Sequence, residues 1–162
     1  MTPGPAQDAA QAPCRVLIVD DSALVRRLLA RGLAEDPRIV VVGEAADAYS
    51  ARDLMVAEEP DVLTLDVEMP RMNGLAFLRA VMTHMPTPTI VISSHTRQSR
   101  RLTMDALAAG AVDVIAKPEA ALGGGFAAQM SDIRARVLAA KGARPARAPS
   151  ATDRPAPAGG AR

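Results

Sequence analysis

Short runs of apolar, β-branched residues alternate along this chain with segments whose apolar residues recur at helical spacing. Five such runs lie at residues 16–19, 39–45, 62–65, 89–92 and 112–115. The last helical segment shows the spacing clearly, with apolar residues at Phe126, Met130, Ile133 and Val137. Short runs without polar alternation are typical of strands that are buried on both faces. The pattern therefore predicts a parallel sheet with helices on both faces.

The predicted fold is α/β, a doubly wound five-stranded parallel sheet with five helices. The most economical strand order is the flavodoxin-like order 2-1-3-4-5, in which the first and third strands are neighbours. The carboxyl ends of parallel strands share one edge of the sheet, and ligands bind in the crevice at that edge. Asp20 and Asp21 follow the first strand, so we expect them beside Asp66, which follows the third.

Asp66 ends the third apolar run, and the chain then turns before helical spacing resumes at Leu75. Pro70, Asn73 and Gly74 supply the turn residues. Taken alone, an aspartate in this place is equally well explained as a turn residue, because its side chain can accept hydrogen bonds from nearby backbone. The residues that the fold brings beside it decide between the two interpretations.

Three carboxylates at one crevice repel one another. Two like charges ~4 Å apart at an effective dielectric constant of ~20 cost about 4 kcal/mol. A bound cation would relieve this repulsion, and oxygen ligands without a nearby histidine or cysteine favour magnesium, with calcium and manganese as alternatives. The sequence therefore predicts a Mg²⁺ site formed by Asp20, Asp21 and Asp66.

Two further polar residues end strands at the same edge, Ser93 after the fourth run and Lys117 after the fifth. Each is ordinary by itself, since a serine often makes a local turn and a Lys-Pro pair often marks a solvated strand exit. The aspartates after the first strand could likewise cap the next helix. Their convergence favours a site that accepts a phosphoryl group, because a metal cation and an ammonium neutralise its oxygens. Asp66 would be the in-line nucleophile.

Composition excludes several other classes of function. The formal net charge of +1 gives no overall attraction to nucleic acid or anionic membranes, and three aromatic residues are too few for base or flavin stacking. The single cysteine, Cys14, rules out an internal disulfide, and we expect it to be a small buried hydrophobe. The sequence shows neither a secretory signal nor a membrane span, so we expect a cytoplasmic location.

Local composition divides the 162 residues into three parts. Residues 1–13 are rich in proline and alanine and predict a disordered leader. Residues 14–141 carry all the strand and helix patterns and are expected to form one domain of ordinary size. Residues 142–162 are rich in proline, alanine and arginine and predict a disordered tail or a truncated linker.

The strand-end residues resemble, in order and spacing, the motifs of the response-regulator receiver domain. The motif residues are Asp20-Asp21, Asp66, Ser93 and Lys117-Pro118, and the resemblance extends from about Arg15 to Ala140. It implies a two-component phosphoacceptor module that a histidine kinase phosphorylates on Asp66. Ser93 would be the hydroxyl that follows the phosphoryl group, and Lys117 would be its salt-bridge partner.

The same resemblance implies how the metal is held. Asp21, Asp66 and the backbone carbonyl of Glu68 would bind Mg²⁺, and Asp20 would assist through water. Mg²⁺ is the cofactor that the resemblance implies, and we expect no organic cofactor.

More narrowly, residues 66–75 and the segment Ser93-Ser94-His95-Thr96 resemble the N-terminal receiver of chemotaxis protein-glutamate methylesterases. This resemblance implies a chemotaxis-type histidine kinase as partner and a methylesterase output under the control of phosphorylation. A methylesterase catalytic domain or a receptor complex would be a further partner. We expect neither nucleic acid nor membrane insertion.

Two features depart from those families. Receivers commonly carry tyrosine or phenylalanine three residues before the lysine, where this chain has Val114, so switching is expected to use the strand-four loop and the fourth helix. We expect no methylesterase catalytic domain within these residues, since no Gly-x-Ser-x-Gly elbow occurs among them. Ser94 and His95 make a poor catalytic pair, because adjacent side chains in extended backbone point to opposite sides. We therefore expect phosphoryl acceptance but no esterase activity from this polypeptide.

Two alternatives remain open. The chain could be a stand-alone single-domain response regulator or a phosphate sink. More remotely, it could be a Mg²⁺-dependent phosphohydrolase with an aspartyl nucleophile. Such enzymes usually place a second aspartate two residues after the nucleophile as an acid/base, whereas this chain has Glu68 there.

Overall fold

The computed structural model describes residues 12–69, 72–93, 99–117 and 125–143. Most of the predicted leader and tail therefore lies outside the described residues, as do Pro70, Ser94, His95 and Pro118. Within the described ranges, no helix is both long enough and apolar enough to cross a lipid bilayer.

The described residues form five helices and seven strands, two of which are very short. In chain order they are β1 (Cys14–Val19), α2 (Ala23–Ala34), β2 (Ile39–Ala45), α3 (Ala48–Glu58), β3 (Val62–Leu65), β4 (Glu68–Met69), β5 (Met72–Asn73), α4 (Gly74–His84), β6 (Thr89–Ser93), α5 (Ser99–Ala108), β7 (Asp113–Ala116) and α6 (Gly125–Ala140). Each predicted strand is present, and its ends differ from the prediction by no more than two residues. The antiparallel pair β4–β5 was not predicted.

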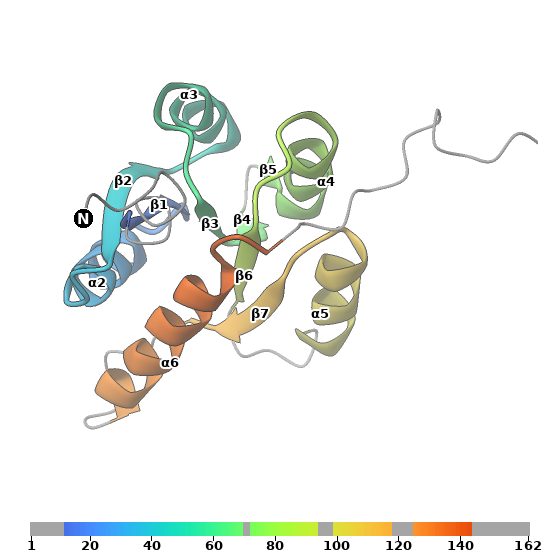
Figure 1. Cartoon of the computed structure of the whole chain (residues 1–162). Coiled ribbons are helices and arrows are strands. Elements are labelled where there is room, and N and C mark those ends of the chain that lie inside the picture. The colour runs from blue at the N-terminus through green and yellow to red at the C-terminus, as the bar shows by residue number, and fades with distance from the viewer. Residues whose placement is uncertain (1–11, 70–71, 94–98, 118–124, 144–162) are drawn as a thin grey trace, which may run out of the picture.

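The main sheet has the predicted topology. Its five strands are parallel and follow the order β2-β1-β3-β6-β7, which is 2-1-3-4-5 when these five strands are counted along the chain. In Figure 1, α2 and α6 lie on one side of the sheet, and α3, α4 and α5 lie on the other. The α/β doubly wound prediction is therefore confirmed, and β1 and β3 are neighbours.

Alternate residues of the central strands face two separate apolar cores, as period-2 side-chain directions require. Leu17 and Leu63 belong to the core that contains α3, α4 and α5 residues, whereas Val16 and Val62 belong to the core under α2 and α6. The predicted stripe of α6 is confirmed at Met130, Ile133 and Val137, each of which is buried in the second core. Burial on both faces explains why the strands carry continuous apolar runs.

Local hydrogen bonds cap the start of α2 and close the end of α5. Ser22 caps α2, because its hydroxyl oxygen accepts a hydrogen bond from the Val25 backbone N–H at 3.2 Å. Gly110 follows α5 in a left-handed conformation with φ of 114°. The backbone N–H groups of Gly110 and Ala111 donate to the carbonyls of Leu107 and Ala106, which closes the helix in a Schellman motif.

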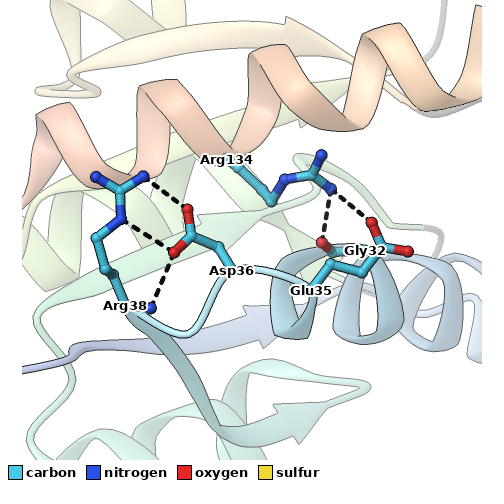
Figure 2. Close-up of polar contacts among 5 residues, drawn as sticks. All are labelled: Gly32, Glu35, Asp36, Arg38 and Arg134. Atoms are coloured by element: carbon cyan, nitrogen blue, oxygen red, sulfur yellow. Dashed lines mark hydrogen bonds and ion pairs between the residues drawn. The ribbon is translucent and has the colours of Figure 1, made fainter.

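Polar contacts connect helix α6 to α2 on the side of the sheet that these two helices cover (Figure 2). Arg134 of α6 donates to the backbone carbonyl of Gly32 at 2.9 Å and pairs with Glu35 at 3.2 Å. Gly32 also allows a close approach, because a Cβ atom there would overlap the end of the Met130 side chain. The packing of α6 against α2 therefore places one face of α6 firmly against the sheet.

The turn that follows α2 carries the second ion pair drawn in Figure 2. The Asp36 carboxylate accepts hydrogen bonds from the Arg38 backbone N–H at 2.9 Å and from its guanidinium at 2.8 and 3.0 Å. These bonds lower the pKa of Asp36 from 3.8 to about 2. A lowered carboxyl pKa stabilises the folded state above the unfolded value, and this stabilisation is lost as pH falls through the folded value.

We predict that Asp36→Asn flattens the dependence of unfolding free energy on pH between about pH 4 and pH 2. Urea unfolding of both proteins at a series of pH values measures this slope. Asp132→Asn, which removes an exposed carboxylate from α6, is the control for the change in net charge. Equal slopes for wild type and Asp36→Asn would contradict the assignment.

Candidate functional site

Three carboxylates meet at the carboxyl edge of the sheet, as the strand order predicts. Val19 and Leu65 are partners in the β1–β3 pairing, so the residues that follow them, Asp20 and Asp66, come out side by side. Asp20 and Asp66 are buried, with 1% and 0% of their surface exposed, whereas Asp21 is exposed. One oxygen from each of the three carboxylates lies within 4.8 Å of the others.

Each buried aspartate uses one oxygen to fix its own turn. Oδ1 of Asp20 accepts a hydrogen bond from the Ser22 backbone N–H at 2.8 Å. Oδ1 of Asp66 accepts one from the Glu68 backbone N–H at 2.9 Å. The turn-capping interpretation is therefore correct for one oxygen of each aspartate. The second oxygen, Oδ2, is left for other contacts.

Lys117 supplies those contacts from the end of β7. Its ammonium lies 2.9 Å from Oδ2 of Asp66 and 3.4 Å from Oδ2 of Asp20. Burial lowers the pKa of Lys117, but the hydrogen bond to Asp66 and the charges of the two aspartates outweigh it and raise that pKa. The ammonium is therefore charged at neutral pH and offsets part of the repulsion between the carboxylates.

The contact with Lys117 does not fully compensate the negative charge of Asp20. Burial, together with the nearby charge of Asp66, raises its pKa from 3.8 to about 6, against the lowering effects of the Ser22 hydrogen bond and of Lys117. Oδ2 of Asp20 is fully buried and accepts no hydrogen bond from any described residue. Burying a carboxylate oxygen without a hydrogen-bond donor costs free energy, and a bound cation would reduce this cost.

The donor set fits a hard divalent cation. It consists of carboxylate oxygens that lie within 4.8 Å of one another, and Asp21, which supplies one of them, is an exposed residue. Oxygen ligands with partial access for water suit Mg²⁺. The described residues that could hold the ion are therefore Asp20, Asp21 and Asp66. The ligand role of the Glu68 backbone carbonyl stays a prediction.

Ser93 and Val114 occupy the places that the sequence predicts, at the end of β6 and inside β7. Ser93 is 5% exposed, and its backbone carbonyl accepts the Lys117 N–H at 2.8 Å. Val114 is half-buried and packs against the core that contains α5 residues. The roles of the Ser93 hydroxyl and of the strand-four loop in switching stay predictions, because residues 94–98 lie outside the described chain.

Two residues that contact the site were missed in the sequence. Arg26 of α2 donates to the backbone carbonyl of Asp20 at 2.6 Å and lies 3.7 Å from the Glu44 carboxylate. Gln129 of α6 donates to the backbone carbonyls of Ala116 and Lys117. The spacing of apolar residues carries no signal for either contact, because both depend on the reach of a polar side chain from a helix to a strand end.

This arrangement agrees with a known family. The sequence matches the response regulator receiver domain over residues 16–122. The chain belongs to the response-regulator receiver family. Membership confirms the predicted resemblance and connects this receiver domain, with its cluster of Asp20, Asp21 and Asp66, to two-component signalling.

Comparison with individual proteins places this receiver near chemotaxis proteins. It is 58% identical over 130 residues to "Protein-glutamate methylesterase/protein-glutamine glutaminase 2" of Cereibacter sphaeroides, a match that covers 80% of this chain and 36% of the relative. The chain thus spans about a third of the length of that relative. The fold also matches the crystal structure of the response regulator domain of Thermotoga maritima CheB, with a TM-score of 0.72, 36% identity, and coverage of 82% of this chain and 99% of that one.

A second solved structure contains a related chain together with a partner. It is the P1 domain of CheA3 in complex with CheY6 from R. sphaeroides, matched with a TM-score of 0.66 and 30% identity. The match covers 79% of this chain and 98% of that one. The narrower resemblance to chemotaxis proteins is thereby confirmed at the level of the receiver.

The raised pKa of Asp20 gives a pH-dependent prediction for the metal-free protein. A carboxyl group whose folded pKa is raised favours folding below the unfolded pKa, and this contribution is lost as pH rises through the folded pKa. Between pH 4 and pH 7, Asp20→Asn should therefore gain about 2 kcal/mol of unfolding free energy relative to wild type. Urea unfolding in the presence of a chelator measures the difference. A difference that does not change with pH would show that Asp20 is not destabilised by its charge.

Gly74 controls the position of the chain just after Asp66. A Cβ atom at Gly74 would overlap the Val67 Cα and lie 2.8 Å from the Val67 carbonyl oxygen. We predict that Gly74→Ala lowers the unfolding free energy by about 1–3 kcal/mol, because backbone cannot yield as a side chain can. Gly43→Ala is the control, since the atoms nearest to its Cβ would be side-chain carbons of Leu17 and Leu54, at 3.2 Å or more. Equal losses in urea unfolding would contradict this account.

Proposed function

We propose that this receiver accepts a phosphoryl group on Asp66 from the phosphohistidine of a histidine kinase, with the help of Mg²⁺. The contact between the Lys117 ammonium and Oδ2 of Asp66 carries the proposal. A buried carboxylate with one oxygen held by backbone and the other beside a cation is preorganised for attack on phosphorus.

The transfer is a displacement at phosphorus. A carboxylate oxygen of Asp66 forms the new bond, the bond from phosphorus to the donor nitrogen breaks, and its electron pair stays on the histidine. The product is an aspartyl phosphate. Lys117 changes its ion-pair partner from the carboxylate to the phosphoryl oxygens as their charge comes into its reach.

The other residues act on charge and position. Asp20, Asp21, Asp66 and the backbone carbonyl of Glu68 would hold Mg²⁺, which when bound supplies positive charge next to the phosphoryl oxygens. The Ser93 hydroxyl, from a residue 5% exposed at the end of β6, would donate a hydrogen bond to the phosphoryl group. Arg26 supports the site from α2 by holding the Asp20 carbonyl.

For the partner, a chemotaxis-type kinase has the best support, since a structurally similar chain occurs in complex with a CheA3 P1 domain. The high identity to a methylesterase supports an output in which phosphorylation regulates a methylesterase catalytic domain or receptor complex. A stand-alone regulator or phosphate sink is the alternative output. The cytoplasmic location and the boundaries 1–13, 14–141 and 142–162 stay predictions of the sequence.

Incubation with acetyl phosphate and Mg²⁺ tests the proposal. Intact mass spectrometry should show one added phosphoryl group on wild type and none on Asp66→Asn, because the amide is a poor nucleophile. Asp53→Asn, at an exposed position of α3, is the control and should be modified like wild type. Unmodified wild type, or a modified Asp66→Asn, would refute the assignment of Asp66.

A further inference from the structure

The amide of Gln129 holds the end of β7 from helix α6. Its Nε2 donates to the Ala116 carbonyl at 3.0 Å and to the Lys117 carbonyl at 2.8 Å. We propose that Gln129 is a positioning residue for phosphoryl transfer, which fixes the Lys117 backbone and thereby the place of the ammonium against Asp66. This inference rests on the proposed function and adds to it a residue outside the charged cluster.

Lys117 needs such a support because of where it lies. It follows the last residue of β7, an outer strand of the sheet whose one neighbour is β6. Its backbone N–H donates to the Ser93 carbonyl on the β6 side at 2.8 Å. Its carbonyl is held from the α6 side by Gln129. Hydrogen bonds with β6 and with α6 therefore hold the Lys117 backbone at the point where its strand ends.

A glutamine is suited to this task. Its amide carries two N–H donors on one nitrogen, so a single side chain can serve two successive carbonyls. The next residue, Met130, is 2% exposed and packs in the core under α2 and α6 together with Ile133 and Val137. Packing of α6 against the core thus fixes the position of Gln129 relative to β7. Gln129 in turn fixes the position of Lys117 relative to the aspartates.

The geometry at the ammonium makes this support matter for rate. A lysine side chain is a flexible stem with a compact charge, so its reach follows the position of its backbone. Displacements of about 1 Å at a reacting centre cost up to ~10²-fold in rate. Loss of both hydrogen bonds from the Gln129 amide should therefore slow phosphorylation of Asp66 by about tenfold, without removing any group that touches the phosphoryl donor.

The test compares substitutions on the same helix. Gln129→Met keeps the length of the side chain and removes both donors, and Gln129→Glu keeps the shape and replaces the donors with acceptors. Arg134→Met is the matched control, because Arg134 also ties α6 to a backbone carbonyl, that of Gly32, on α2 (Figure 2). All three variants lose a tether of α6, but only the Gln129 variants lose the tether to Lys117.

Two measurements separate positioning from general loss of stability. The first is the rate of Asp66 phosphorylation by acetyl phosphate at saturating Mg²⁺, with the Mg²⁺ dissociation constant measured in parallel by calorimetry. The second is hydrogen exchange of the Lys117 backbone amide in the absence of any phosphodonor. We expect both Gln129 variants to react about tenfold more slowly with an unchanged Mg²⁺ affinity, and their Lys117 amide to exchange faster. Arg134→Met should match wild type in rate and in Lys117 exchange.

The possible results distinguish this inference from the proposed function. If wild type is phosphorylated and both Gln129 variants react at the wild-type rate, the positioning role is refuted while the function stands. Equal slowing in Arg134→Met would also refute it, since the effect would then be one of stability. If wild type takes up no phosphoryl group, the proposed function and the kinetic role of Gln129 fall together, and the exchange data then report only on the fold.

Discussion

The contact of one ammonium with two buried carboxylates is the interaction on which this site depends. Asp20 and Asp66 are almost completely removed from solvent, and an uncompensated pair of buried charges would be strongly destabilising. Lys117 reaches both of them, at 3.4 and 2.9 Å, and so makes their burial tolerable. The compensation is incomplete, because two negative charges face one positive charge and the pKa of Asp20 stays raised. This remaining imbalance is the feature of the site that a bound cation would relieve.

The rest of the fold acts on this contact through backbone. The β1–β3 pairing sets the two aspartates side by side, and the Ser22 and Glu68 N–H groups each hold one of their oxygens. On the other side, β6 and α6 hold the lysine. No single helix or strand forms the site. Its geometry is the result of several independent packing relations that agree.

Much of this could be predicted because it depends on pattern alone. Apolar runs buried on both faces predict a parallel sheet, and its economical strand order predicts that Asp20 meets Asp66. The repulsion between the buried carboxylates is weaker than their charges alone predict, because the Lys117 ammonium already lies against both of them.

The contacts that were missed depend on distances that a linear pattern does not contain. Gln129 and Arg26 act because a helix lies close enough for a polar side chain to reach a strand end. Gly74 matters because backbone passes directly over it at Val67. The β4–β5 pair joins strands of two residues each, which are too short to show any periodicity. Such features follow from tertiary packing, so they become visible only in three dimensions.

The ammonium of Lys141, just after α6, lies 2.6 Å from the carbonyl of Ala12, just before β1. The two ends of the described chain therefore meet at the pole of the sheet opposite the aspartates, because β1 runs from that pole toward Asp20. A fold with adjoining ends can be joined there and reopened elsewhere. A circularly permuted protein, or one carrying bulky fusion partners at that pole, would leave the edge of the sheet that carries the three aspartates unchanged. With this geometry, a neighbouring domain joined at one end of the sheet would lie far from the aspartates at the other end.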